Sequence, residues 1–228
     1  VNTTKTLINY GANRNNVFEY HFTTLFKSEV LLEVTAEAEI KELRLKYNLK
    51  PNIPYLVFVG QLIHRKGLDI LIDAFRNIKY PNTELLLIGD GDKLNDLRKS
   101  VMESNLEDKI HFLGKMSKDN VLEYLRLSDV FVFPSREDIW GLVLNEAISN
   151  GLPVVSTKQV GASFSLIKNN LNGFIIDSES SKQLSDSINM ILFKDIKKNK
   201  EESLKIAADY TIELMVDDHL KLFNKFYK

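Results

Sequence analysis

The sequence contains no cysteine, one tryptophan and five prolines among its 228 residues. Without cysteine the chain cannot form disulfide bonds, zinc–thiolate sites or a thiol nucleophile, and this absence fits a reducing cytoplasm. Lys and Arg total 30 against 31 Asp and Glu, so no excess of positive charge would attract nucleic acid or an anionic membrane. Any phosphate group that the protein binds must therefore be held by a local cluster of residues.

Long apolar runs are also missing. None approaches the ~20 residues of a membrane-spanning helix, and the N-terminal segment lacks the apolar centre of a signal peptide. We expect a cytoplasmic protein, with peripheral attachment to the inner face of the membrane left open. The chain starts with Val, so we expect the functional protein to extend beyond these 228 residues. At 44% hydrophobic and 27% charged residues, the composition is that of a globular protein with one sizeable core.

Short apolar runs alternate with longer amphipathic segments from residue 55 onward, which is the pattern of a parallel sheet covered by helices on both faces. Most runs are apolar nearly throughout, as strands buried on both faces should be. The segment 67–78 carries its apolar residues at helical spacing. We predict an α/β fold with a Rossmann-like, doubly wound parallel sheet of about six strands. The predicted strands are residues 55–60, 84–89, 109–114, 129–134, 152–157 and 173–177.

The N-terminal part of the chain holds too little periodic structure for a domain of its own. It predicts a short helix, a turn around residues 11–13, a candidate strand, and a second helix over 36–49. We expect residues 1–50 to be a remnant of a preceding domain with its connection, and residues 51–228 to form one domain.

The C-terminal part is predicted to be helical. Helical periodicity runs through residues 181–193 and again through 211–227. Between them lies a Lys-rich link at 194–200, which we predict to be a solvated helix boundary.

We expect the ligand site in the loops that follow the strands, because ligands of an open parallel sheet bind beyond the carboxyl ends of its strands. The loop after the first strand ends with Arg65 and Lys66 at the start of a helix. Two cations at the positive end of a helix are unfavourable unless an anion lies there, which indicates a phosphate site. The alternative is that both side chains point into water.

The loop after the second strand contains Gly89, Asp90 and Gly91. Two glycines permit a tight turn and the close approach of a ligand to the backbone. An ordinary strand-to-helix turn is the alternative, because the GxGxxG spacing of a dinucleotide site is absent.

The segment 134–155 is the most informative in the chain. Asp138 and Glu146 lie eight positions apart, with Gly141 between them and a helical pattern from Leu142. Glu146 would lie about one turn into that helix, where its carboxylate can accept hydrogen bonds from the two hydroxyls of a ribose. Gly141 would let backbone N–H groups face a diphosphate. The alternative makes Asp138 a helix cap and Glu146 an exposed acid.

Other catalytic signatures are missing. The histidines show no HExxH spacing, and neither a GxSxG elbow nor a GxxxxGK[ST] loop occurs, which counts against a zinc enzyme, a serine hydrolase and a P-loop NTPase. Trp140 either packs its own loop or stacks on a ligand.

Taken together, the three loops resemble the family 4 glycosyltransferases, whose C-terminal domain shows VGRLxxxKG, GxGP and PSxxEGFGLVxLEAMAxGxPVV in this order. The resemblance covers about residues 55–177 and, more loosely, the closing helix. It implies that residues 51–228 are the nucleotide-sugar-binding C-terminal domain of a GT-B fold. The implied reaction is the retaining transfer of a hexosyl group from a nucleoside diphosphate sugar to a hydroxyl acceptor.

The resemblance also implies residue roles. Asp138 would lie near the transferred sugar, Glu146 on the ribose, and Lys66 on the diphosphate, so that Lys66 and Asp138 are the expected catalytic residues. The base would contact mainly backbone near Leu113. The expected donor-binding residues are Gln61, Arg65, Lys66, Leu113, Asp138, Gly141, Leu142, Val143 and Glu146.

Four positions depart from the family pattern. Gln61 replaces the arginine of GRL, which removes one phosphate cation unless Arg65 substitutes. Asp92 replaces the proline of GxGP, and no acid occurs near Ser165 where the family often has one. Asp138 is one methylene shorter than the usual Glu and has Glu137 beside it, although only Asp138 keeps the eight-residue spacing.

The resemblance implies no metal and no other cofactor, since cations and helix amides would neutralise the diphosphate. Residues 90–92 spell the DxD of metal-dependent transferases but fall at the family's glycine turn. The expected partners are a UDP-, GDP- or ADP-sugar and a missing N-terminal acceptor domain, without which the isolated chain would be inactive. The alternatives are a non-catalytic nucleotide-sugar-binding subunit and a GT-B nucleotide-sugar epimerase.

Overall fold

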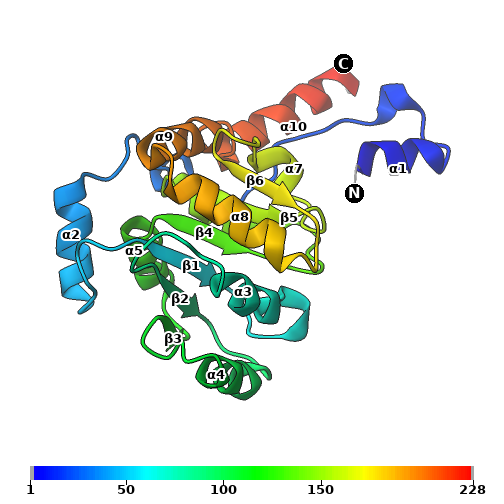
Figure 1. Ribbon diagram of the computed structural model, residues 1–228. Coiled ribbons are helices and arrows are strands. Elements are labelled where there is room, and N and C mark those ends of the chain that lie inside the picture. The colour runs from blue at the N-terminus through cyan, green and yellow to red at the C-terminus, as the bar shows by residue number, and fades with distance from the viewer. Residues whose placement is uncertain (1–2, 227–228) are drawn as a thin grey trace.

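One sheet of six parallel strands forms the centre of the computed structural model, which describes residues 3–226 (Figure 1). Its strand order is β3-β2-β1-β4-β5-β6, so the chain moves outward from β1 in one direction and then from β4 in the other. This order places a topological switch point between β1 and β4. The strands are β1 (Tyr55–Val59), β2 (Glu84–Ile88), β3 (Ile110–Gly114), β4 (Val130–Phe133), β5 (Val154–Thr157) and β6 (Gly173–Ile176).

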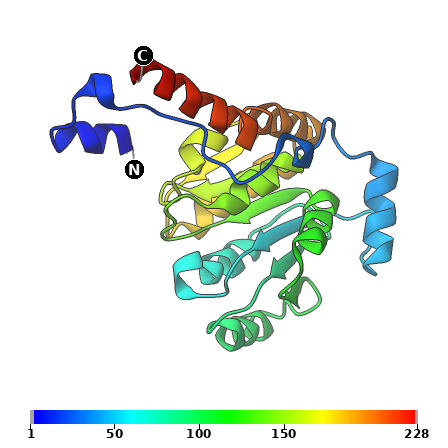
Figure 2. The same cartoon turned by 180° about the vertical axis from the view of Figure 1, so that it is seen from behind.

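Helices cover both faces of the sheet. In Figure 1, α3, α4 and α8 lie over the face toward the viewer, whereas α5 and α6 lie over the other face, which Figure 2 turns forward. The helices are α1 (Thr3–Asn9), α2 (Glu37–Lys46), α3 (Leu68–Phe75), α4 (Leu94–Glu103), α5 (Lys118–Leu127), α6 (Leu142–Ser149), α7 (Ser163–Leu166), α8 (Ser181–Leu192), α9 (Ile196–Ala207) and α10 (Ile212–Phe226). Short 3-10 turns are η1 (Arg14–Asn16), η2 (Lys27–Glu29) and η3 (His64–Lys66).

The predicted doubly wound sheet is confirmed, because all five strand pairings are parallel and each strand lies within its predicted range. Strands β2, β4 and β5 are buried along their whole length, as their continuous apolar runs predict. The edge strands β3 and β6 are only partly buried. The predicted helix over 211–227 corresponds to α10, and residue 227 lies outside the described residues.

The Lys-rich segment 194–200 contains the predicted helix boundary, since α8 ends at Leu192 and α9 begins at Ile196, but it is not solvated throughout. Asp195 caps α9 by accepting hydrogen bonds from the backbone N–H groups of Lys197 and Lys198, so most of the segment belongs to that helix. Lys200 is buried and its Nζ donates a 2.9 Å hydrogen bond to the carbonyl of Ser128. A partner 72 residues away in the chain therefore overrides the preference of lysine for solvent.

A buried charge cluster joins α2 and α9 to the start of β4. Arg44 donates hydrogen bonds to the carbonyls of Leu127 and Pro51, at 2.9 and 3.1 Å, and to Oδ2 of Asp129 at 2.8 Å. The Nζ of Lys200 lies 3.7 Å from the other carboxylate oxygen of Asp129. Helix α2 is therefore anchored on the sheet end opposite the loops that follow the strands.

The candidate strand near the N-terminus does not form. Residues 17–31, here called the N-terminal strap, run extended across α6 and then into η2, without a strand partner in the described chain. Asn145 donates to the carbonyl of Phe22 at 3.4 Å, and the N–H of Leu31 donates to the carbonyl of Ser149 at 3.0 Å. Because the strap lies over a helix rather than beside a sheet edge, no ladder is available to it.

The two ends of the described chain lie on one side of the sheet. Helix α1 and the far end of α10 extend beyond the sheet in both views (Figures 1 and 2). The N–H of Ile212, at the start of α10, donates to the carbonyl of Leu25 in the strap at 2.8 Å. Among residues 3–226, no helix is long and apolar enough to span a bilayer.

Candidate functional site

The loops after β1, β2, β4 and β5 meet at the carboxyl end of the sheet, beside the switch point. The N–H of Leu62 donates to the carbonyl of Asp90 at 2.9 Å, which ties the first two loops together. The N–H of Asp138 donates to the carbonyl of Gln159 at 3.0 Å, which ties the loop after β4 to the loop after β5. The N–H of Arg136 donates to the carbonyl of Arg65 at 2.8 Å and joins these two pairs, so that the four loops form one connected surface.

Close packing between loops explains why the second loop has glycine at positions 89 and 91. A Cβ on Gly89 would lie 1.8 Å from the carbonyl oxygen of Gly60, and one on Gly91 would lie 2.4 Å from that of Leu62. The structural alternative for this turn is therefore supported, since only glycine allows the two loops to pack this closely. In the part of the chain that the structure describes, no group of three His, Cys, Asp or Glu side chains could hold a metal ion.

Lys66 is placed by a turn that only glycine accommodates well. The 3-10 turn η3 ends at Lys66, and Gly67 follows with φ 69°, where a Cβ would lie 2.2 Å from the carbonyl oxygen of Pro134. This close approach sets the loop directly on the end of β4. The Lys66 side chain is only 9% exposed; its Nζ donates to Oδ2 of Asp138 and lies 4.7 Å from the ring centre of Phe133. The alternative that Lys66 points into water is wrong.

Asp138 is distinguished from its neighbour Glu137 by this contact. The Asp138 side chain is 18% exposed and faces Lys66, whereas Glu137 is exposed and contributes its backbone carbonyl to Arg65 at 2.7 Å. Gly141, not Asp138, is the N-cap residue of α6, so the capping alternative is wrong. The structure brings Lys66 and Asp138 together from two neighbouring strands.

Helix α6 starts at the same place. Gly141 has φ 90°, and its Cβ position lies 2.8 Å from Cγ1 of Val160, so a side chain there would be strained and crowded. The N–H groups of Leu142 and Val143 belong to the first turn and have no acceptor within the helix. The positive end of α6 is thus set beside Asp138, in the geometry that suits an anion.

Glu146 lies one turn further along α6 and is half-buried, so it is not the exposed acid of the alternative interpretation. Burial raises the pKa of its carboxyl; the ammonium of Lys118 opposes this and Glu29 adds to it. Lys118 is itself bound to Glu29 of the N-terminal strap at 2.5 Å. The structure therefore provides a partly desolvated acceptor on the helix that begins at Gly141.

Two further predicted residues lie on the same sheet edge. Gln61 is exposed in the loop after β1, and Leu113 is half-buried near the end of β3. The carbonyl of Gly114, next to Leu113, accepts a 2.9 Å hydrogen bond from the N–H of Gly89. Arg65 is exposed, in contrast to Lys66, and one of its terminal nitrogens donates to the Glu137 carbonyl.

Trp140 packs within the protein. Its Nε1 donates to Oδ1 of Asn145 at 2.9 Å, and its ring meets Phe22 of the strap edge-on at a centroid distance of 5.4 Å. The packing alternative is therefore the one that the structure supports.

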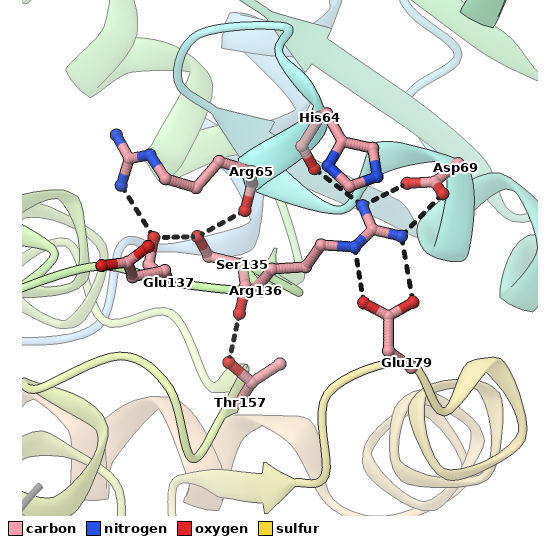
Figure 3. A network of polar contacts seen from close by, with 8 residues as sticks. All are labelled: His64, Arg65, Asp69, Ser135, Arg136, Glu137, Thr157 and Glu179. Atoms are coloured by element: carbon pink, nitrogen blue, oxygen red, sulfur yellow. Dashed lines mark hydrogen bonds and ion pairs between the residues drawn. The ribbon is translucent and has the colours of Figure 1, made fainter.

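Arg136 is a prominent side chain at this edge that the sequence patterns did not single out (Figure 3). It lies two residues before Asp138 and contacts Asp69, Glu179 and the carbonyl of His64. The only signal in the sequence is an unusually dense run of charges at 136–138, in which Arg136 has no marked spacing.

Comparison with solved structures shows the fold. HepE of Anabaena in complex with UDP aligns with a TM-score of 0.84 at 21% identity, over 98% of this chain and 62% of HepE. WaaG, a glycosyltransferase involved in lipopolysaccharide biosynthesis, aligns with a TM-score of 0.73 at 20% identity, over 99% of this chain and 60% of WaaG. The architecture is that of one domain of the GT-B fold.

Curated relatives are similar over most of this chain but are much longer. The GDP-mannose-dependent alpha-(1-6)-phosphatidylinositol monomannoside mannosyltransferase of Mycobacterium tuberculosis is 31% identical over 160 residues, which are 66% of this chain and 41% of that protein. The N-acetyl-alpha-D-glucosaminyl L-malate synthase of Bacillus anthracis is 27% identical over 166 residues, 72% of this chain and 43% of the enzyme. The aligned region spans less than half the length of both relatives.

The family comparison covers both the sheet and the site. The model of the family described as Glycosyl transferases group 1 matches residues 39–209, which include every strand and all four connected loops. Because this match covers well over half of the sequence, the chain belongs to the group 1 glycosyltransferases.

Proposed function

We propose that this chain forms the donor-binding half of a retaining hexosyltransferase of family 4. The donor would be a UDP-, GDP- or ADP-sugar and the acceptor a hydroxyl group. The observation that carries the proposal is that Glu146, the start of α6 and Asp138, which is paired with Lys66, follow one another along α6 and the loop before it.

In the proposed pose, the donor lies along these residues in the same order. The ribose hydroxyls donate to the carboxylate of Glu146, and the diphosphate lies against the N–H groups of Gly141, Leu142 and Val143. The base extends toward the backbone near Leu113. The hexosyl group then lies at Asp138, beyond the diphosphate.

Lys66 and Asp138 carry the chemistry. Transfer breaks the bond between the anomeric carbon and the β-phosphate oxygen and forms one between that carbon and the acceptor oxygen, whose proton passes to the departing diphosphate. Negative charge develops on the diphosphate as the first bond breaks. The ammonium of Lys66, with the guanidinium of Arg65 and the helix amides, stabilises that charge as it forms. Asp138 accepts hydrogen bonds from the sugar once Lys66 turns to the phosphate. These groups can do this without a metal ion, so we propose that none is needed.

The acceptor half is proposed to lie outside this chain. Relatives more than twice as long as the matched region have room for a second domain, and a cleft between two domains excludes water from the reacting groups. We propose that residues 1–50 connect to that domain, that the isolated chain binds donor without transferring sugar, and that the protein acts in the cytoplasm or at the inner face of a membrane.

A thermal-shift series tests the donor site. UDP, GDP and ADP are each added at millimolar concentration, with and without EDTA, to the wild type and to Lys66→Ala and Glu146→Ala. We expect one nucleotide to raise the Tm equally with and without EDTA, and both variants to reduce the shift. No shift with any nucleotide, in a protein shown to be folded, would overturn the proposal.

A non-catalytic nucleotide-sugar-binding subunit is the second candidate, favoured by Gln61 at the position where the family carries an arginine. It predicts the same Tm shifts. The two candidates separate when the chain is extended through its upstream coding region: release of nucleoside diphosphate with sugar transfer supports the enzyme, and binding without turnover supports the subunit.

A further inference from the structure

Arg136 uses every hydrogen-bond donor that it has. Its Nε donates to Glu179 at 2.5 Å, one terminal nitrogen donates to the carbonyl of His64 at 2.7 Å and to Asp69 at 2.8 Å, and the other donates to Asp69 at 2.8 Å and to Glu179 at 3.0 Å. A guanidinium has five N–H groups, so none remains for a ligand. These contacts, shown in Figure 3, are here called the Arg136 clamp.

The charge balance points the same way. Two carboxylates face a single guanidinium whose side chain is only 16% exposed, so Arg136 presents no net positive charge to a phosphate. Burial works against ionisation of Asp69, yet the hydrogen bonds and charge of Arg136 hold the pKa of Asp69 below its usual range. Arg136 is therefore a structural cation, unlike Lys66 and Arg65 nearby.

The clamp joins three loops. His64 lies in the loop after β1 and Asp69 in the first turn of α3, on either side of Lys66 in the chain. Arg136 precedes Asp138 in the loop after β4, and Glu179 lies in the loop after β6. Bidentate contacts with two carboxylates fix the guanidinium in position and orientation, which a single ammonium could not do.

Backbone contacts extend the clamp to the phosphate cations. The carbonyl of Arg65 accepts from the N–H of Arg136 at 2.8 Å and from Oγ of Ser135 at 3.1 Å. The carbonyl of Ser135 in turn accepts from Oγ1 of Thr157 at the end of β5. The segment 64–66 is therefore held against the segment 135–138 at three consecutive residues: His64 and Arg65 through their carbonyls, and Lys66 through its ammonium.

We propose that Arg136 is a positioning residue for donor binding: the clamp fixes Lys66 and Arg65 where they meet the diphosphate, while Arg136 itself touches no part of the donor. This inference rests on the proposed function. Its physical basis is pre-organisation, because a phosphate cation that is already held in place loses less freedom when the donor binds.

Isothermal titration of nucleotide pairs tests the inference. UDP with UMP, GDP with GMP and ADP with AMP are titrated into the wild type, Lys66→Ala, Arg136→Gln and the double variant. The ratio of diphosphate to monophosphate affinity isolates the contacts to the second phosphate. We expect Lys66→Ala to abolish most of the ratio, Arg136→Gln to lower it about tenfold, and the double variant to lose no more than Lys66→Ala alone.

Two further variants separate positioning from stability and from charge. Lys182→Ala removes a surface ion pair with Asp186 on α8 and should leave the ratio unchanged. Arg136→Lys keeps the charge but cannot bridge two carboxylates and a carbonyl, so the ratio should stay low. If Arg136→Gln does not fold, the Asp69→Asn and Glu179→Gln double variant loosens the clamp with Arg136 in place and should lower the ratio likewise.

Three outcomes would overturn the inference. Suppose that the wild type binds nucleotide and that a folded Arg136→Gln variant has the same ratio of diphosphate to monophosphate affinity. This result overturns the inference but not the proposed function, even if the Tm of the variant falls. Full recovery of the ratio by Arg136→Lys overturns the clamp in favour of charge. Absence of nucleotide binding by the wild type overturns the proposed function, and the inference with it.

Discussion

Lys66 and Asp138 lie 72 positions apart in the chain, yet the Nζ of one donates directly to the carboxylate of the other with both side chains mostly buried. The pair neutralises two charges that would otherwise be costly at this depth. In the proposed pose, donor binding replaces the Asp138 carboxylate with the diphosphate as the anionic partner of Lys66. This exchange makes the two residues separable by experiment.

Lys66→Met should weaken nucleoside diphosphate binding by about 10- to 100-fold, the range of a charged hydrogen bond worth ~1.5–3 kcal/mol. Isothermal titration measures the loss. Lys93→Met is the matched control, because Lys93 directly precedes α4 and pairs with Asp96 in the first turn of that helix. The affinity of this variant should equal that of the wild type. If both substitutions weakened binding equally, the loss would reflect the removal of positive charge in general and would contradict a specific contact between Lys66 and the diphosphate.

Asp138→Asn should act on the sugar and not on the diphosphate. The amide no longer holds Lys66 by charge, so nucleoside diphosphate affinity should stay equal or rise by about two- to fivefold, a change of ~0.4–1 kcal/mol. The extra affinity of the intact nucleotide sugar over the diphosphate should disappear. Competition titrations of the two ligands give both numbers, and a parallel loss of both affinities would contradict the assigned role.

Glu146→Gln should stabilise the ligand-free protein at neutral pH while weakening nucleotide binding. Burial raises the pKa of Glu146, with Lys118 opposing and Glu29 adding, so the unfolded state ionises first as pH rises. The folded state therefore loses stability between the ordinary carboxyl pKa and the raised one, and stays penalised above it. The neutral variant avoids this penalty.

The pH profile of Tm checks this sign. The Tm of the variant should exceed that of the wild type by an amount that grows as pH rises above the ordinary carboxyl pKa, and this difference should level off above the raised pKa of Glu146. Asp119→Asn, an exposed acid on α5, should show no such trend. A constant offset at all pH values would mean that the effect does not come from ionisation of Glu146.

Arg44→Met should lower the free energy of unfolding by about 3 kcal/mol, because it leaves the buried carboxylate of Asp129 with a more distant cation and two carbonyls without a donor. Chemical denaturation measures the loss. Lys46→Met on the same helix breaks an exposed pair with Glu123 and should change stability little. Comparable losses from both variants would count against the buried cluster as the anchor of α2.

The sheet was predictable because its strands are buried on both faces, and an uninterrupted apolar run such as 85–88 has no other stable location. Lys66, Asp138 and Glu146 were accessible because their spacing repeats a family pattern. Arg136 and Lys200 were not, since a charged side chain is expected in solvent unless its partners are known. Those partners lie at positions 69, 179 and 128, and no local pattern connects them.

The strap has a consequence for chimeric proteins. Its backbone is hydrogen-bonded to α6 through Asn145 near the middle of the helix and through Ser149 at its end, while Glu29 engages Lys118 on α5. A chimera joined at residue 50 would leave α6 covered by a foreign sequence that was not selected to fit it. Junctions placed before residue 17 transfer the N-terminal strap together with α6, so that their contacts are kept.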